Sequence, residues 1–167
     1  DSSPDCLGQK HAKIQTNKQT NKQTNKQRVS MDPVTITEAQ QDYLNNHKWA
    51  VLATGRTDGS PQLSQIGYAW NGKDFAISVK SYTAKWKNAL RQPKVALLIH
   101  DGRKQLVVYG EAQCIDQDPQ RAELTERVFQ ILTDDPNFKG DAKFIKMMDE
   151  EQRTIFRIIP TKILMNE

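Results

Sequence analysis

Residues 31–167 are predicted to form a small, mainly β fold, a six-stranded antiparallel barrel with flanking helices. Three observations predict it. Short runs of β-branched and other apolar residues recur along the chain, tight-turn pairs such as Asp58-Gly59, Asn71-Gly72 and Asp101-Gly102 separate several of them, and few segments have a helical period. These residues contain no GxGxxG, P-loop or GxSxG motif, which argues against dinucleotide, nucleoside triphosphate and esterase sites.

The first half of this region reads as one helix and three strands. Thr37 is the expected cap of a helix over 37–47. Strands are expected over 49–54, 62–70 and 74–80, joined by two tight turns into a meander.

The second half alternates helices and strands. Helices are expected over 83–91, 119–132 and 141–149, and strands over 95–100, 105–115 and 153–164. Gly110 in the middle of a long strand predicts a bend or bulge. In the helix 119–132 the apolar residues Leu124, Val128, Ile131 and Leu132 are expected to form the buried stripe.

The positive charge belongs to the first thirty residues. They carry six basic and two acidic side chains, which equals the net charge of +4 of the whole chain, so residues 31–167 are formally neutral. This distribution argues against a nucleic-acid partner. Gln15–Gln27 repeats the unit QTNK, and a polar repeat of this kind is expected to be disordered. We expect residues 1–30 to be a translated nucleotide repeat or an added extension, with Met31 as the natural start.

Composition favours a cytoplasmic protein without a membrane segment. No apolar run approaches the roughly 18 residues that a membrane span needs. The two cysteines, Cys6 and Cys114, form no disulfide framework or metal motif, and Cys114 is expected to be an inert core thiol. No metal site or Ser-His-Asp triad is evident, so an enzyme here would need a cofactor that performs the chemistry.

The segment Ser78–Pro93 is the strongest candidate for a binding site. It ends a strand, turns and starts a helix, and it brings Lys80, Ser81 and Lys85 close together. A helix start offers free N–H groups and the positive end of the helix dipole, so these residues predict a phosphate cradle centred on Lys85. A solvated basic helix face is the alternative. The acidic run Asp149–Glu151 is expected to be a solvated helix end, and the three tryptophans are expected in the core.

These motifs together resemble a known family. The segment AVLATGRTDGSPQLSQIGYAW (50–70), the run from Lys85 through Asn88 to Pro93-x-Val-Ala-Leu-Leu, and VVYGEA (107–112) resemble the pyridoxamine 5′-phosphate oxidase-like FMN-binding split barrels. The similarity covers nearly all of residues 35–164. It is greatest to the small subgroup of deazaflavin-dependent reductases.

The resemblance implies a six-stranded split barrel that forms a homodimer, with the cofactor at the subunit interface. Lys85 matches a lysine that contacts the cofactor phosphate, and Val79, Lys80 and Ser81 lie where the strand end approaches the phosphate and the ring. Gln105 matches a glutamine that contacts the flavin. The backbone of Ser64, Gln65, Ile66, Gly67 and Tyr68 occupies the strand that lines the isoalloxazine.

Two departures separate the chain from the true pyridoxamine phosphate oxidases. Ala84 stands where those enzymes have an arginine, and Arg157-Ile-Ile-Pro160 only superficially matches their substrate-binding Arg-Leu-x-Pro element. We therefore expect a different substrate.

The leading hypothesis is an oxidoreductase that transfers hydride between a cofactor and an unknown small substrate. FMN is the first candidate cofactor, and an 8-hydroxy-5-deazaflavin (coenzyme F-420 type) is the alternative. No catalytic residue is identified, although Tyr68 or an ordered water is a candidate proton donor. The rival hypothesis is a non-catalytic protein that binds or senses a flavin on the same barrel.

Overall fold

The computed structural model describes residues 34–166. The predictions for residues 1–30 and for Met31 as the natural start concern residues outside this range. The elements in chain order are α1 (Glu38–Asn45), β1 (Trp49–Gly55), β2 (Pro61–Gly67), β3 (Ala69–Trp70), β4 (Phe75–Lys80), α2 (Ala84–Arg91), β5 (Lys94–Asp101), β6 (Lys104–Ile115), α3 (Gln120–Leu132), α4 (Ala142–Glu150) and β7 (Arg153–Asn166).

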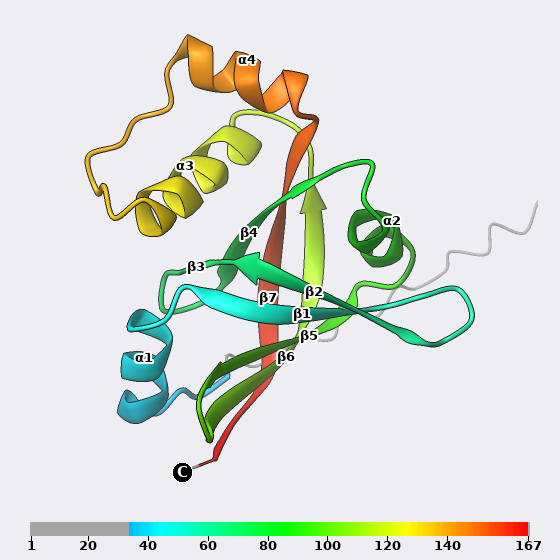
Figure 1. The fold of residues 1–167 in the computed structure, drawn as a ribbon, viewed down its shortest axis with the longest axis vertical. Helices are drawn as coiled ribbons and strands as arrows, with labels where there is room; N and C mark the ends of the chain where they lie inside the picture. Colours follow the sequence, from blue (N-terminus) through cyan, green and yellow to red (C-terminus); the bar gives the residue numbers. More distant parts are fainter. Residues whose placement is uncertain (1–33, 167) are drawn as a thin grey trace, which may run out of the picture. The chain divides into compact units, whose positions relative to one another are not determined.

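The strands form one curled antiparallel sheet in the order β2-β1-β5-β6-β7-β4-β3 (Figure 1). β2 and β4 approach each other across the gap, so the sheet curls into a partly open barrel. The prediction of a mainly β antiparallel split barrel with flanking helices is confirmed, but residues 34–166 form seven strands where six were expected.

The predicted meander is wrong in its middle strand, although the Asn71-Gly72 turn joins β3 to β4 as expected. The expected strand 62–70 divides into β2 and the two-residue β3, which lie at opposite ends of the strand order. Tyr68 makes the break: its backbone N–H donates to the Lys48 carbonyl (3.0 Å) and its hydroxyl donates to the Leu44 carbonyl (3.0 Å). The chain thereby crosses from one edge of the sheet to the other, which a reading of local turns does not reveal.

The barrel interior is the main hydrophobic core. Alternate residues of the strands point into it, and α2 contributes Trp86, which stacks on Phe156 with ring centroids 5.4 Å apart. The core expectation holds for Trp86, but Trp70 is only half-buried and Trp49 is 53% exposed. Trp49 lies on the outer side of β1. The periodicity of the sequence could not identify which residues lie beside it.

Gly110 forms the bulge that its position predicts. The register of β6 against β7 shifts between Tyr109 and Gly110, and a Cβ at Gly110 would lie 2.6 Å from the Ile159 carbonyl oxygen. Only glycine fits this close approach of two backbones.

The predicted apolar stripe of α3 is confirmed at three of its four residues: Val128 is buried, and the half-buried Leu124 and Leu132 pack against the same cluster. Ile131 is exposed, and Arg121 and Thr125 are buried in addition. Arg121 is buried because it is ion-paired: its Nη2 lies 2.7 Å from both Asp118 Oδ2 and Asp149 Oδ1. Asp118 is only three residues from Arg121, but the sequence offered no signal for Asp149, which lies 28 residues further along on α4.

This ion pair makes stability depend on pH. The Arg121 guanidinium, hydrogen-bonded to Asp118, holds the pKa of that carboxyl below its ordinary value. A lowered folded-state pKa contributes stability above the unfolded pKa of about 3.9, and the contribution is lost as pH falls through the folded pKa. We expect the loss of unfolding free energy in Asp118→Asn to be constant between about pH 5 and 7 and to shrink below about pH 4. Urea titrations of the wild type and of Asp118→Asn at a series of pH values measure this difference in unfolding free energy. A difference that did not change with pH would contradict the lowered pKa of Asp118.

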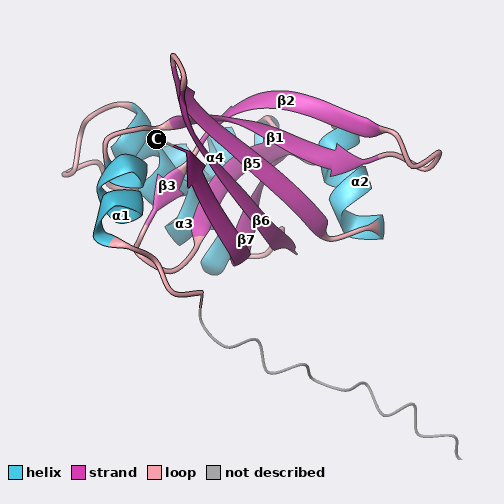
Figure 2. Cartoon of the chain, turned by 90° about the horizontal axis from the view of Figure 1, so that it is seen from below, coloured by secondary structure: helices cyan, strands magenta, loops and turns pink. Residues whose placement is uncertain are grey.

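One face of the sheet carries exposed apolar side chains. Trp49, Leu63, Tyr109 and Leu164 are 45–65% exposed and project outward from β1, β2, β6 and β7. Val51, Leu98 and Val107 are half-buried between them. In Figure 2 the strands β1, β5, β6 and β7 lie in the foreground, and the helices lie at the sides or behind them. We call these seven residues the outer sheet face.

Among residues 34–166, no helix has the length and apolar character needed to cross a membrane.

Candidate cofactor phosphate site

The turn from β4 into α2 leaves the helix start uncapped by side chains. The Thr83 hydroxyl donates to the Lys80 carbonyl (2.7 Å), so it does not accept from the first-turn N–H groups. Ser81 fixes the turn to the residue just before β7, because its N–H donates to the Gln152 carbonyl (2.9 Å). The N–H groups of the first turn of α2 therefore remain available to an anion. Lys85 is the second residue of this helix and is half-buried.

A charged cluster that the sequence did not predict lies beside this turn. Lys80 pairs in register with Arg153 at the start of β7, and Glu151 lies between their side chains. Glu151 Oε2 is 2.7 Å from Arg153 Nη2 and 3.5 Å from Lys80 Nζ. The two cations hold the pKa of Glu151 below its ordinary value, with Arg153 as the larger cause. We call Lys80, Glu151 and Arg153 the charged cluster.

These contacts leave one N–H donor of the Arg153 guanidinium without a hydrogen-bond partner. Its Nε is buried without a hydrogen-bond partner, and its guanidinium lies over the Phe129 ring, 5.6 Å from the centroid. Nη1 is 3.4 Å from the Ser78 hydroxyl. The Lys80 and Lys85 ammonium groups, at the strand end and in the first turn of α2, join the free helix N–H groups in a donor set that suits a phosphate. The residues present therefore fit the phosphate of a flavin-type cofactor.

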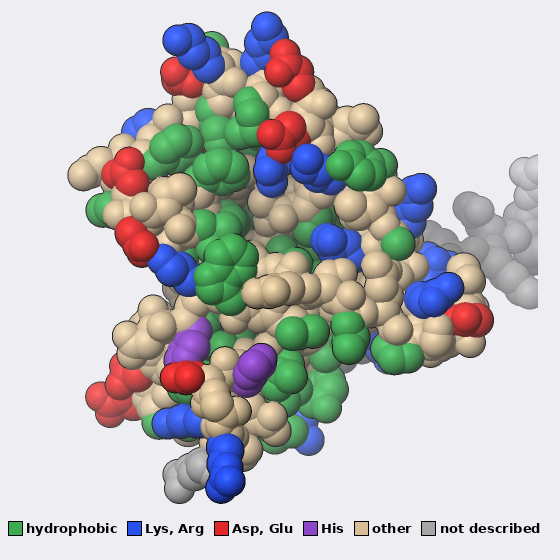
Figure 3. All heavy atoms as spheres, in the orientation of Figure 1, with side chains coloured by type: hydrophobic (Ala, Val, Ile, Leu, Met, Phe, Trp, Pro, Cys, Tyr) green, Lys and Arg blue, Asp and Glu red, His purple; other side chains and the backbone are tan. Residues whose placement is uncertain are grey.

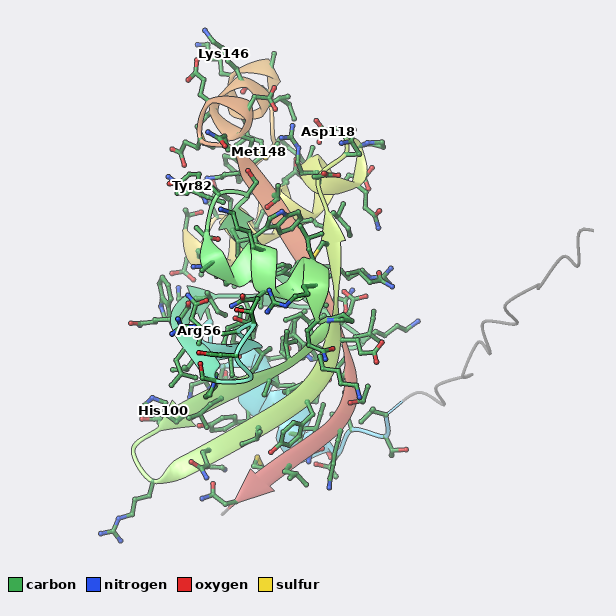
Figure 4. All side chains as sticks on the ribbon, turned by 90° about the vertical axis from the view of Figure 1, so that its right-hand side faces the viewer. Arg56, Tyr82, His100, Asp118, Lys146 and Met148 are labelled. Atoms are coloured by element: carbon green, nitrogen blue, oxygen red, sulfur yellow. The ribbon has the colours of Figure 1, made fainter. Side chains whose placement is uncertain are left out.

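Asn88 fixes α2 against the barrel. Its side-chain amide donates to Thr54 Oγ1 (3.1 Å) and Gln62 Oε1 (2.9 Å), which joins the helix to β1 and β2. A pocket of about 280 Å³ lies at this junction, lined by Arg56, Thr57, Gln62, Ala84 and Asn88. Ala84 thus faces open space where an arginine would add a charge. Figure 4 shows Arg56 near α2 and Tyr82 on the side of α2 that faces α4.

The predicted ring-lining strand lies on β2, at the edge of the sheet. Ser64 and Ile66 face inward beside Leu52 and Ala50, whereas Gln65 is exposed. Gln65 lines a pocket of about 300 Å³ with Trp49, Ala50, Val51 and His100. The two histidines of the described part of the chain, His47 and His100, lie on one face (Figure 3).

Tyr68 is not placed to donate a proton to a ligand. Its side chain is 1% exposed, its hydroxyl already donates to Leu44, and burial raises its pKa. The candidate role as proton donor is therefore wrong for the tyrosine, which anchors the core. Gly67 is covered as well, because a Cβ there would lie 2.5 Å from Leu132 Cδ2.

Within one chain, Gln105 lies away from Lys80, Ser81 and Lys85. It lies at the start of β6, paired with His100, and its N–H donates to the Asn166 side chain (2.6 Å). β5 runs from the end of α2 to this hairpin, and its eight residues span about 25 Å. Val79 is buried in the core and offers a ligand no free side-chain surface.

Two other expectations concern residues near the site. Cys114 is half-buried against the main core, and burial raises the pKa of its thiol to about 11, which disfavours the reactive thiolate. The expectation of a solvated helix end holds for Asp149 and Glu150, which are exposed at the end of α4, although Asp149 also pairs with Arg121 and Glu150 with Lys146. Glu151 is less exposed and belongs to the charged cluster. A further pocket of about 480 Å³ lies elsewhere, between the ends of α1 and α3.

The curled antiparallel sheet with its flanking helices defines a split-barrel protein. A family model described as pyridoxamine 5′-phosphate oxidase matches residues 36–166. The chain belongs to this family, whose structures share the FMN-binding split barrel.

Solved structures agree with this fold. An F-420 reductase is 26% identical with a TM-score of 0.57, over 77% of this chain and 98% of that chain. The conserved hypothetical protein Rv2991 of Mycobacterium tuberculosis is 21% identical with a TM-score of 0.64, over 80% of this chain and 86% of that one. HutZ, the heme storage protein of Vibrio cholerae, is 16% identical with a TM-score of 0.54, over 78% of this chain and 94% of that one.

Proposed function

We propose that the chain binds FMN or an 8-hydroxy-5-deazaflavin and transfers hydride between that cofactor and a small substrate. The observation that carries this proposal is the uncapped start of α2, with Lys85 in its first turn and Lys80 beside it, in a chain of this family. When bound, the cofactor supplies the redox chemistry. The F-420 reductase among the similar structures supports the deazaflavin alternative.

The residues of the chain hold and orient the cofactor. Lys80, Ser81, Lys85 and the free N–H groups of α2 bind the phosphate. β2 pairs only with β1, so the backbone groups along its other edge are not part of the ladder. These groups on Ser64–Ile66 are available to bind the polar edge of a ring system.

We also propose a homodimer with the cofactor at the subunit interface. The outer sheet face offers contiguous apolar surface of the kind that associates. Gln105 lies at the β5–β6 hairpin, at the other end of β5 from α2. A cofactor shared between two subunits would allow Gln105 of one chain and Lys85 of the other to contact the same molecule.

A non-catalytic cofactor-binding protein is the second candidate. The specific observation in its favour is that Tyr68, the side chain expected to donate a proton, is buried and hydrogen-bonded. Consumption of reduced cofactor in the presence of unsaturated acceptors distinguishes an enzyme from a binder.

The variant Lys85→Ala tests the proposed site. We expect about a tenfold loss of affinity for FMN or the deazaflavin, because one charge-assisted contact to the phosphate is removed. Fluorescence titration of the full chain measures it. Lys143→Ala is the matched control, since Lys143 is also the second residue of a helix, follows an alanine and is exposed. Equal affinity in Lys85→Ala and Lys143→Ala would remove Lys85 from the site, and a wild-type chain that binds neither cofactor would overturn the proposed function.

A further inference from the structure

Trp49 exposes a large aromatic ring at the start of β1. The other two tryptophans of the chain pack against phenylalanines, Trp70 against Phe75 and Trp86 against Phe156. Trp49 is 53% exposed, and among residues 34–166 no other aromatic ring packs on it. A free indole face on a rigid strand is suited to stack on a planar ligand.

Two polar side chains share a pocket with this ring. The pocket of about 300 Å³ at Trp49 is also lined by Gln65 from β2 and His100 from β5. Val51 pairs in register with Gln65 on one side and with Leu98 on the other, so side chains of three adjacent strands meet here. Gln65 and His100 are exposed, and neither side chain forms a hydrogen bond within residues 34–166. Both are therefore free to bind a ligand.

The lining of the pocket indicates the kind of ligand that fits. It contains no Lys, Arg, Asp or Glu side chain, so it offers no counter-charge to an ion. The Gln65 amide can donate and accept hydrogen bonds, and the His100 imidazole offers a further polar atom, which suits a carboxamide or carbonyl oxygen. A volume of about 300 Å³ is at the lower end for ligand sites, and it suits one or two fused rings and not a whole cofactor.

The pocket adjoins two parts of the proposed cofactor site. Gln65 lies on β2, whose free backbone edge is proposed to bind the ring system. His100 is the register partner of Gln105, the glutamine expected to contact the flavin. A molecule in this pocket would therefore lie between two groups that the proposed function assigns to the cofactor ring.

We propose that this pocket holds the small substrate, and that the substrate is an uncharged planar ring compound that carries a carboxamide or carbonyl oxygen. This inference rests on the proposed function. Trp49 stacks on the ring of the substrate, and Gln65 and His100 form hydrogen bonds with its polar group.

Trp49→Ala tests the stacking, with 2-naphthamide as the probe. We expect it to bind 2-naphthamide about tenfold more weakly than the wild type, because the aromatic platform is lost. NMR titration of the full chain loaded with FMN measures the affinity through the Gln65 side-chain amide signals. Tyr109→Ala is the control and is expected to keep the wild-type affinity, since Tyr109 is an exposed aromatic residue of the outer sheet face that does not line this pocket.

Gln65→Leu tests the hydrogen bond. We expect about a fivefold loss of 2-naphthamide affinity, measured through the Trp49 indole N–H signal, because the polar group of the probe loses a partner. Gln113→Leu, at an exposed position of β6 outside the pocket, is the control. A saturated analogue, decahydronaphthalene-2-carboxamide, is expected to bind the wild type about tenfold more weakly than 2-naphthamide, since it cannot stack.

Three outcomes would overturn this inference alone. They are equal 2-naphthamide affinity in Trp49→Ala and Tyr109→Ala, a wild type that binds FMN but not 2-naphthamide, and a loss of FMN affinity in Trp49→Ala but not in Tyr109→Ala. The last would assign the pocket to the cofactor and not to the substrate. A wild-type chain that binds neither FMN nor the deazaflavin would overturn the proposed function and the substrate role of the pocket with it.

Discussion

Replacing Asp74 by alanine is expected to cost about 3–5 kcal/mol of unfolding free energy, the largest single effect of any side chain discussed for this fold. Asp74 has a side-chain exposure of 5%, and its carboxylate joins three elements. Oδ2 accepts from Arg157 Nε (2.9 Å) and lies 2.8 Å from Arg157 Nη2, and Oδ1 accepts from Arg127 Nη2 (3.2 Å). Without Asp74, two partly buried arginines lack a counter-charge.

The loss is a large fraction of the stability of a domain of this size, and it corresponds to a fall in melting temperature of about 10 °C or more. Thermal and urea unfolding of Asp74→Ala measure it. Asp42→Ala, at an exposed position of α1, is the control and is expected to leave stability unchanged or slightly raised. A cost below about 1 kcal/mol for Asp74→Ala would show that solvent compensates the arginines.

If the proposed dimer forms, a lysine at Leu164 is expected to convert it into a monomer and to abolish most of the cofactor affinity. Leu164 lies on β7 in the outer sheet face, opposite Val107, and is 45% exposed in the single chain. The substitution therefore costs the folded monomer little. In the proposed dimer it would bury an unpaired ammonium group between two apolar surfaces, which costs several kcal/mol.

Sedimentation equilibrium and the cofactor titration measure both effects in one preparation. The matched control is Leu90→Lys, since Leu90 is an exposed leucine on α2 outside this face. A wild-type chain that is monomeric at high concentration would contradict the proposed dimer. A monomeric Leu164→Lys with unchanged cofactor affinity would place the cofactor away from the interface.

Local patterns were enough to predict most of the fold. The Thr37 cap is confirmed, with Gln40 completing a capping box, and so are the bulge at Gly110 and the helices that start near residues 84, 120 and 142. Each depends on residues within a few positions of one another. The division of β2 from β3 was not predicted, because it depends on the contacts of Tyr68 with Leu44 and Lys48. These residues lie 24 and 20 positions before Tyr68 in the sequence.

The same contrast applies to the site. Lys80, Ser81 and Lys85 are near one another in sequence, so the pattern of a strand end followed by a helix start indicated them. Arg153 and Glu151 are about 70 residues further along, and only the register of β4 against β7 brings them to Lys80. Buried ion pairs such as Asp74 with Arg157 were missed for the same reason: charged residues in a sequence do not identify their partners.

Hydrogen–deuterium exchange with and without FMN, or with the deazaflavin if that is the ligand that binds, tests the central claim most directly. The account predicts slower exchange in two places, the amides from Ser81 to Lys87 and the free edge of β2. Riboflavin is predicted to protect β2 but not the start of α2. Protection confined to other segments, such as the pocket between the ends of α1 and α3, would contradict a phosphate site at the start of α2.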